Sequence, residues 1–158
     1  DWVKLSPEDA ETLANRIPNL VAWKDGQGDT RAYQRIIDRL GDRFHWIGGI
    51  GDDCVPAYYS IGIRTYTSSI ATVAPKISLL LHEYAASGNT EALAKLMSKY
   101  VLPIYEFRTR MKGYEVSAMK ALMNLSGQNG GKVRPPLPEV LEEEMPILQT
   151  IADTMAEA

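Results

Sequence analysis

A lysine stands at the end of an apolar run that has the composition of a buried β-strand. Residues 20–23 read Leu-Val-Ala-Trp, and Lys24 follows them directly. A run this apolar is typical of a parallel strand that is covered on both faces. In an α/β barrel, catalytic side chains project from the carboxyl ends of the strands, so Lys24 is either a functional amine or a solvated residue at the rim. A functional amine would attack a carbonyl carbon.

Two helices are expected on either side of this strand. Residues 5–19 predict the first, because Ser6 can cap it, Pro7 takes the first helical position and apolar residues follow at helical spacing. Residues 28–42 predict the second, which has one apolar face and ends at Gly41. The strand that carries Lys24 is therefore expected to lie between two packed helices.

Two more strands are expected downstream, at residues 43–50 and 63–69, where β-branched and aromatic residues gather. A short helix over residues 52–62 separates them, which Asp53 could cap and Gly62 could end. Alternation of helices and strands with short connections predicts right-handed crossovers and a parallel sheet.

Beyond residue 69 the expected elements are helical. Pro103 is expected to kink one of these helices, and the last helix is expected to form although it contains Pro146. Four helices are expected, over residues 74–89, 90–110, 115–127 and 139–158. A loop rich in Gly and Pro is expected over residues 128–139.

Composition excludes several classes of partner. The chain has 17 basic and 20 acidic residues and a formal net charge of -3, with no long block of one sign, so nucleic acid is not an expected partner. Cys54 is the single cysteine, which rules out a disulfide within the chain. We find neither a signal-peptide pattern nor an apolar run near 18 residues, so no membrane partner is expected and the cytoplasm is the expected compartment.

Other polar residues give weaker signals. His45 and His82 have no partners at ligand spacing, and the pair at residues 52–53 is more typical of a helix cap than of a metal site, so no metal is expected. Cys54 has no histidine placed to activate it. The cations in residues 108–112 could bind an anion or could complement a helix dipole, and the sequence favours neither interpretation.

Four stretches together resemble the 5-dehydro-4-deoxyglucarate dehydratases, a family within the dihydrodipicolinate synthase and N-acetylneuraminate lyase superfamily. These stretches are residues 19–29 (NLVAWKDGQGD), 62–75 (GIRTYTSSIATVAP), 107–123 (FRTRMKGYEVSAMKALM) and 132–139 (KVRPPLPE). The resemblance implies an α/β fold: the C-terminal part of a (β/α)8 TIM barrel, with strands six to eight and the C-terminal helices. Residues 1–70 would form a partial barrel with three parallel strands, and residues 71–158 the last barrel helix and a helical extension.

The resemblance also implies the chemistry. Lys24 corresponds to the strand-six lysine that forms a Schiff base with a 2-oxo acid, here for the decarboxylating dehydration of 5-dehydro-4-deoxyglucarate to 2,5-dioxopentanoate without a cofactor. Gly49, at the end of strand seven, leaves room for backbone to approach the substrate, and Thr67 and Ser68, ending strand eight, offer hydroxyls and backbone donors. The resemblance further implies that the protein acts on a small-molecule 2-oxo acid as a homotetramer.

Two alternatives stay open. Residues 51–54, Gly-Asp-Asp-Cys, differ from the Pro-Thr-Ala-Glu type of run in the dehydratases and resemble other members of the superfamily, which favours a sibling aldolase or synthase that uses pyruvate. The second alternative is a non-catalytic fragment or partner subunit. The family takes its proton-transfer tyrosine from strand five, which would lie before residue 1, so this segment alone is expected to be inactive.

Overall fold

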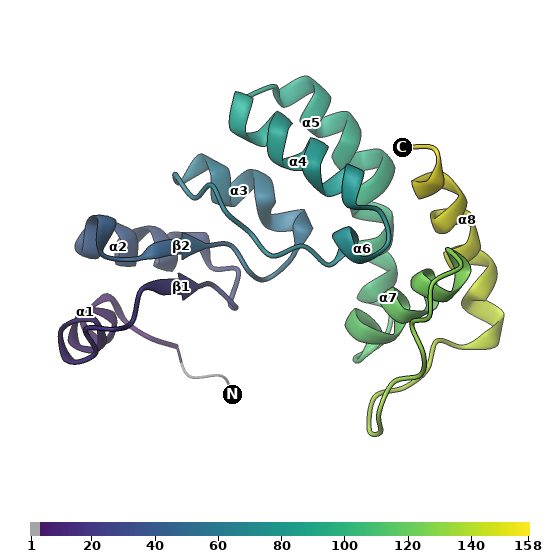
Figure 1. The fold of residues 1–158 in the computed structure, drawn as a ribbon, viewed down its shortest axis with the longest axis horizontal. Helices are drawn as coiled ribbons and strands as arrows, with labels where there is room; N and C mark the ends of the chain where they lie inside the picture. Colours follow the sequence, from purple (N-terminus) through teal and green to yellow (C-terminus); the bar gives the residue numbers. More distant parts are fainter. Residues whose placement is uncertain (1–3) are drawn as a thin grey trace. The chain divides into compact units, whose positions relative to one another are not determined.

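The computed structural model describes residues 4–158 of the chain. Contacts between these residues divide it into two compact units, a first one that ends at Thr67 and a second one, Ser68–Ala158. The first unit carries both strands, and the second is helical (Figure 1). Along residues 4–158, none of the helices has the length and apolar character that crossing a membrane requires.

The first unit is a small parallel sheet with helices. Its strands pair in the register Ala22 with His45, Trp23 with Trp46 and Lys24 with Ile47. In chain order its elements are α1 (Pro7–Arg16), β1 (Ala22–Lys24), α2 (Thr30–Leu40), η1 (Gly41–Arg43), β2 (His45–Ile47), η2 (Asp52–Cys54) and α3 (Val55–Ser60).

The expected start of α1 is confirmed. The Ser6 hydroxyl accepts a hydrogen bond from the Asp9 N–H at 3.1 Å, and the Asp9 carboxylate accepts one from the Ser6 N–H at 3.0 Å. This reciprocal pair satisfies two backbone donors that a helix start leaves without partners. Arg39 on α2 forms ion pairs with Glu8 and Glu11 on α1, so the two helices are joined at their surface as well.

Helix α2 packs through an aromatic residue onto the strand that carries the lysine. Asp29 caps it by accepting the Ala32 N–H at 3.0 Å, and Gly41 ends it with a φ of +53°, as expected. The buried Tyr33 donates its hydroxyl to the Trp23 carbonyl at 2.7 Å. This bond ties α2 to β1 one residue before Lys24.

The expectation of a strand covered on both faces is wrong for this unit. β1 begins only at Ala22, Val21 is 70% exposed, and Ala22 and Trp23 are half-buried. The physical reason is that two short strands and the bridge at Tyr66 do not close into a barrel, so the described residues do not cover both faces of β1.

The prediction of a strand at residues 63–69 is also wrong. The segment makes an isolated parallel bridge between Tyr66 and Gly48, in which Gly48 donates to the Thr65 carbonyl and accepts from the Thr67 N–H, both at 2.9 Å. Pairing stays this short because Gly62 turns the chain just before it, with a φ of +95°. A 3-10 helix begins soon after it, which leaves few extended residues. The bridge nevertheless puts this segment beside β2 in the parallel sense that was expected.

The cap predicted for the short helix is wrong as well. Gly51 occupies the N-cap position of η2, and Asp53 lies inside the helical run, where it cannot cap. The predicted end is correct, because α3 stops before Gly62.

The second unit is a set of helices around a shared apolar core. Its elements are η3 (Ile70–Thr72), α4 (Pro75–Ser87), α5 (Thr90–Leu96), the π-helical turn η4 (Met97–Val101), α6 (Leu102–Arg108), α7 (Tyr114–Leu125), η5 (Glu142–Glu144) and α8 (Met145–Ala156). Fully buried side chains from six of these elements form the core, among them Ile70, Leu81, Val101, Ile104, Leu122 and Leu148.

Two prolines lie where a helix in this unit is interrupted or begins. Pro103 lacks an N–H, and the chain passes through the π-helical turn η4 just before it, so the α-helix is interrupted at the place where a kink was expected. Pro146 lies in the first turn of α8, where a missing N–H costs nothing. The predicted helix therefore begins at Met145 rather than at residue 139, and residues 128–139 form a loop as expected.

Candidate active site

Lys24 is the last residue of β1, and its side chain is exposed. Its Nζ donates a hydrogen bond to the Gly49 carbonyl, with 3.1 Å between the two atoms. Gly49 follows β2 closely, so the carboxyl ends of both parallel strands meet at this amine. An exposed amine at such an edge is in the position from which barrel enzymes direct catalytic groups.

The glycine pair after β2 leaves space for two specific side chains. A Cβ on Gly49 would lie 2.5 Å from both Cγ and Cε of Lys24 and 2.4 Å from the Asp25 carbonyl oxygen. A Cβ on Gly48 would lie 2.4 Å from the ring of Tyr58. Contacts this short exclude any side chain at either position unless the neighbours move. Gly49 thus makes room for the lysine itself.

Asp25 is a buried carboxylate next to the lysine, and only 6% of it is exposed. Its two oxygens accept hydrogen bonds from the N–H groups of Gln27 at 2.9 Å and Gly28 at 3.0 Å. A third bond comes from the Tyr58 hydroxyl at 2.7 Å. Three donors offset the cost of burying a charge here, and they fix the turn that follows Lys24.

Tyr58 on α3 is fully buried, and its hydroxyl lies between Asp25 and the backbone of the glycine turn. The hydroxyl accepts from the N–H groups of Gly49 at 3.4 Å and Ile50 at 3.3 Å while it donates to Asp25. Burial, and then the hydrogen bond to Asp25, raise the pKa of Tyr58 above its usual range. The phenol therefore keeps its proton and serves as a fixed donor.

The two other residues expected at the site fall in different units. Thr67 closes the first unit, where its N–H donates to Gly48, so it is joined to the glycine pair that contacts Lys24. Ser68 opens the second unit. Its hydroxyl contacts the Ser78 hydroxyl at 2.6 Å and accepts the Ala71 N–H at 2.9 Å.

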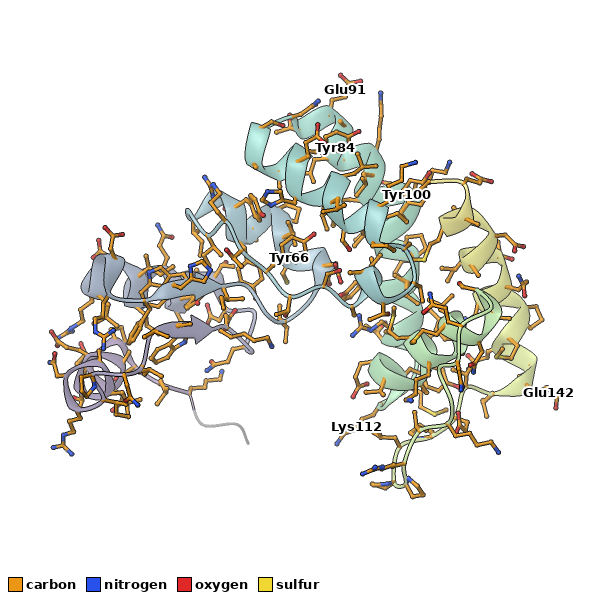
Figure 2. All side chains as sticks on the ribbon, in the orientation of Figure 1. Tyr66, Tyr84, Glu91, Tyr100, Lys112 and Glu142 are labelled. Carbon is orange, nitrogen blue, oxygen red and sulfur yellow. The ribbon has the colours of Figure 1, made fainter. Side chains whose placement is uncertain are left out.

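The cations near the end of α6 have structural partners. Arg108 donates to the Ser69 hydroxyl at 2.9 Å, and Arg110 forms an ion pair with Glu144 at 2.8 Å. Lys112 is exposed and projects away from the helices in Figure 2. These contacts favour the interpretation of Arg108 and Arg110 as residues that hold the end of α6.

The weaker candidates show no sign of chemistry. Burial raises the pKa of the Cys54 thiol, which disfavours the reactive thiolate. In the part of the chain that the structure describes, no three His, Cys, Asp or Glu side chains are grouped as a metal site would need.

Sequence reasoning missed Asp25 and Tyr58. The adjacency of Asp25 to Lys24 was a usable signal, and so was the glycine pair, which indicates a close approach of another group. Nothing in the sequence distinguishes Tyr58 from its neighbour Tyr59, because the register of α3 decides which ring faces Asp25.

Comparison with known proteins identifies the relatives of this chain. Residues 2–155 match the model of the dihydrodipicolinate synthetase family. A protein of Pseudomonas savastanoi pv. phaseolicola named "probable 5-dehydro-4-deoxyglucarate dehydratase" is 36% identical over 152 residues, which are 95% of this chain and 50% of that protein. A protein of the same name from Ralstonia nicotianae is 36% identical over 149 residues, 93% of this chain and 48% of that protein.

Solved structures confirm the expected fold class. Dihydrodipicolinate synthase from Bacillus clausii matches with a TM-score of 0.87 at 19% identity, over 99% of this chain and 53% of that one. N-acetylneuraminate lyase from Proteus mirabilis matches with a TM-score of 0.81 at 24% identity, over 94% of this chain and 49% of that one. The chain spans about half the length of the relatives it matches, as expected for strands six to eight of a TIM barrel with the helices that follow. The chain belongs to the dihydrodipicolinate synthetase family.

Proposed function

We propose that the protein is a Schiff-base lyase in which Lys24 is the nucleophile. Its substrate is a 2-oxo-3-deoxy sugar acid, and its reaction is the decarboxylating dehydration of 5-dehydro-4-deoxyglucarate. The observation that carries this proposal is the exposed amine of Lys24 at the carboxyl end of a parallel strand, against the Gly49 carbonyl. The names of the relatives at 36% identity support the choice of reaction.

The first half of the reaction forms the covalent intermediate. The neutral amine of Lys24 adds to the ketone carbon, and the adduct takes up a proton and loses water to give a protonated imine. This cation withdraws electrons from the neighbouring methylene carbon, which gives up a proton to a base and forms an enamine. The amine thus makes an otherwise weakly acidic carbon reactive.

The second half removes water and carbon dioxide. The enamine expels the hydroxyl on the next carbon, which leaves as water after taking a proton. Loss of the distal carboxyl group as carbon dioxide then leaves electrons on carbon, and these are quenched by a proton. Hydrolysis of the imine returns the free lysine and releases 2,5-dioxopentanoate. The net change is the loss of one water and one carbon dioxide, because the water released on imine formation is consumed on hydrolysis.

Three residues are proposed to hold the substrate. Gly49 would present backbone close to the keto acid end, next to the amine that it already contacts. Thr67 would offer its side-chain hydroxyl to the substrate, while its backbone N–H donates to Gly48 in the bridge. Ser68 would bind the polar chain of the sugar acid. We also propose that the whole protein is a homotetramer, as the resemblance to the family suggests, and that it works in the cytoplasm.

A sibling activity is the second candidate. The run Gly51, Asp52, Asp53 differs from the dehydratase pattern, and it favours an aldolase or synthase for which pyruvate is the imine partner. Both candidates use Lys24 in the same way, so they differ in what happens after the enamine forms.

Product analysis separates the two candidates. The protein in its natural full length is incubated with 5-dehydro-4-deoxyglucarate, and the gas and the organic acids are quantified. Equal amounts of carbon dioxide and 2,5-dioxopentanoate are expected, and the Lys24→Arg variant should give neither. Recovery of pyruvate and an aldehyde would contradict the dehydratase and support the aldolase.

A further inference from the structure

We infer that Asp25 and Tyr58 are positioning residues for the amine of Lys24, and that they act through the peptide group between Gly49 and Ile50. This inference rests on the proposed function, because it assigns them the task of aiming an amine that reacts.

The Gly49–Ile50 peptide group is held at both ends. Its carbonyl oxygen accepts from Lys24 Nζ at 3.1 Å, and its N–H donates to the Tyr58 hydroxyl at 3.3 Å. A trans peptide group is planar, and its carbonyl and N–H point in opposite directions. Holding the N–H therefore fixes the direction of the carbonyl that receives the amine.

The hydroxyl that holds this peptide is itself immobilised. It donates to Asp25 at 2.7 Å, and the Asp25 carboxylate is anchored by the N–H groups of Gln27 and Gly28. The Tyr58 ring packs against Gly48 so closely that a methyl group there would overlap it. Close packing in this turn therefore restricts the Tyr58 ring and the Asp25 carboxylate to their observed positions.

These contacts form a closed circuit through the backbone. Asp25 is the residue after Lys24, and its own N–H donates to the Ile47 carbonyl at 2.8 Å, which extends the pairing of β1 with β2. From Lys24 the circuit runs to Gly49, through Tyr58 to Asp25, and back along the chain. The lysine and its acceptor therefore cannot shift independently of each other.

Such a circuit serves a reacting amine in a definite way. The Gly49 carbonyl can accept an N–H from the free amine and from the protonated imine that replaces it, so the nitrogen keeps one direction during the reaction. Misplacing a reacting group by about 1 Å costs on the order of 100-fold in rate. Removing one hydroxyl while keeping the ring should loosen the peptide only in part, so we expect a loss of roughly tenfold.

A pair of adjacent tyrosines provides the test. Tyr58→Phe removes the hydroxyl that holds the peptide. The matched control is Tyr59→Phe, because Tyr59 is also buried on α3 but donates its hydroxyl to the Arg64 carbonyl at 3.2 Å. Each full-length variant is mixed with pyruvate and borohydride. The rate of adduct formation at Lys24 and the final labelled fraction are then measured over a range of pyruvate concentrations.

We expect Tyr58→Phe to lower the maximal trapping rate about tenfold, with the final labelled fraction and the half-saturating pyruvate concentration unchanged. A purely structural role would reduce the labelled fraction and leave the rate of the folded protein alone. Asp25→Asn should slow trapping in the same way, and it decides the matter if Tyr58→Phe does not fold. Rates within twofold of the wild type, or equal slowing by Tyr59→Phe, would overturn the inference.

Failure of the proposed function gives a different result. A wild-type protein that forms no adduct at Lys24 contradicts the Schiff-base mechanism. Positioning is then measured by reductive methylation with formaldehyde, as the reactivity of Lys24 relative to Lys120 in the same sample. Tyr58→Phe should raise this ratio about threefold, because an amine whose acceptor is loosened is less restrained by its hydrogen bond and is more accessible to a small electrophile that needs no alignment in the site. An unchanged ratio would overturn the inference on its own.

Discussion

Among residues 4–158, two lysines donate to the backbone carbonyl of a glycine, and the two pairs differ in which partner is held in place. Lys24, exposed at the end of β1, donates to Gly49 at 3.1 Å. Lys120, half-buried on α7, donates to Gly130 at 2.6 Å. The same kind of bond therefore occurs once in each unit, so the bond by itself does not identify a functional lysine.

The surroundings of the two carbonyls explain the difference. Gly130 lies in the loop after α7, and its N–H donates to Asn124 on the same helix, so side chains of α7 hold the loop in place. Gly49 is held from its other side by Tyr58, independently of Lys24. Lys120 therefore helps to hold a loop in place. Lys24, by contrast, donates to a carbonyl that other residues already hold, and its amine stays exposed.

The largest expected effect comes from Lys24→Arg. Arginine keeps the positive charge but stays protonated, so it cannot attack a ketone. We expect turnover of 5-dehydro-4-deoxyglucarate to fall by about 10³-fold or more, as for loss of a covalent nucleophile. Lys120→Arg, which keeps a donor for Gly130, is the matched control and should retain activity. A Lys24→Arg enzyme with a tenth of wild-type turnover would remove the distinction between the two lysines.

Gly49→Ala should disrupt the hydrogen bond between Lys24 and the carbonyl of residue 49, although the amine and the carbonyl are both still present. The added methyl group would lie 2.5 Å from the Lys24 side chain. We expect trapping of the imine to slow about 100-fold, because the amine is displaced, and the unfolding free energy to fall by about 1 to 3 kcal/mol. Gly26→Ala is the control, since a Cβ there meets nothing within 4 Å. Equal trapping rates in the two variants would show that Gly49 does not position the lysine.

Ser68→Ala tests whether the Ser68 hydroxyl contributes to substrate binding as well as to structure. Loss of a hydrogen bond to a charged or polar substrate group should lower kcat/KM for the sugar diacid about 10- to 150-fold, while imine formation with pyruvate stays nearly unchanged. Ser60→Ala is a control on α3, where the hydroxyl donates to the Ala57 carbonyl at 2.7 Å. Steady-state kinetics with both substrates distinguish binding of the diacid from a general loss of activity, and an unchanged kcat/KM would remove Ser68 from the site.

Lys120→Met should affect stability alone. Removing a half-buried charged donor should lower the free energy of unfolding by about 1.5 to 3 kcal/mol, measured by urea denaturation. Lys132→Met, at an exposed position in the same loop, should be nearly neutral. The rate of imine trapping should equal that of the wild type in both variants. Slower trapping in Lys120→Met would mean that this lysine is more than an anchor.

Local signals in the sequence predicted those elements that depend on local interactions. Ser6 and Pro7 at the start of α1 and Gly41 at the end of α2 act within one or two turns, so their types determine the boundaries. Lys24 was placed at a strand end for the same reason. The prediction of a strand at residues 63–69 was wrong because strand pairing depends on the turn at Gly62 as much as on β propensity.

The support of the lysine could not be predicted, because it is tertiary. Tyr58 meets Asp25 across 33 residues of sequence, and the choice between Tyr58 and Tyr59 depends on the rotation of α3. Gly49 was expected to leave room for backbone to approach the substrate, but the group that lies against Gly49 is the lysine side chain itself. Periodicity assigns faces to helices, and only the packed structure shows which side chains meet.

The most direct test of the central claim is to map the lysine that forms the imine. The natural full-length protein is incubated with pyruvate or with a 2-oxo-3-deoxy sugar acid, reduced with borohydride, and digested for mass spectrometry. The adduct is expected at Lys24, with Lys120 and Lys132 unmodified and with no label in the Lys24→Arg variant. Labelling at Lys120 or Lys132 in place of Lys24 would contradict the assignment of Lys24 as the nucleophile.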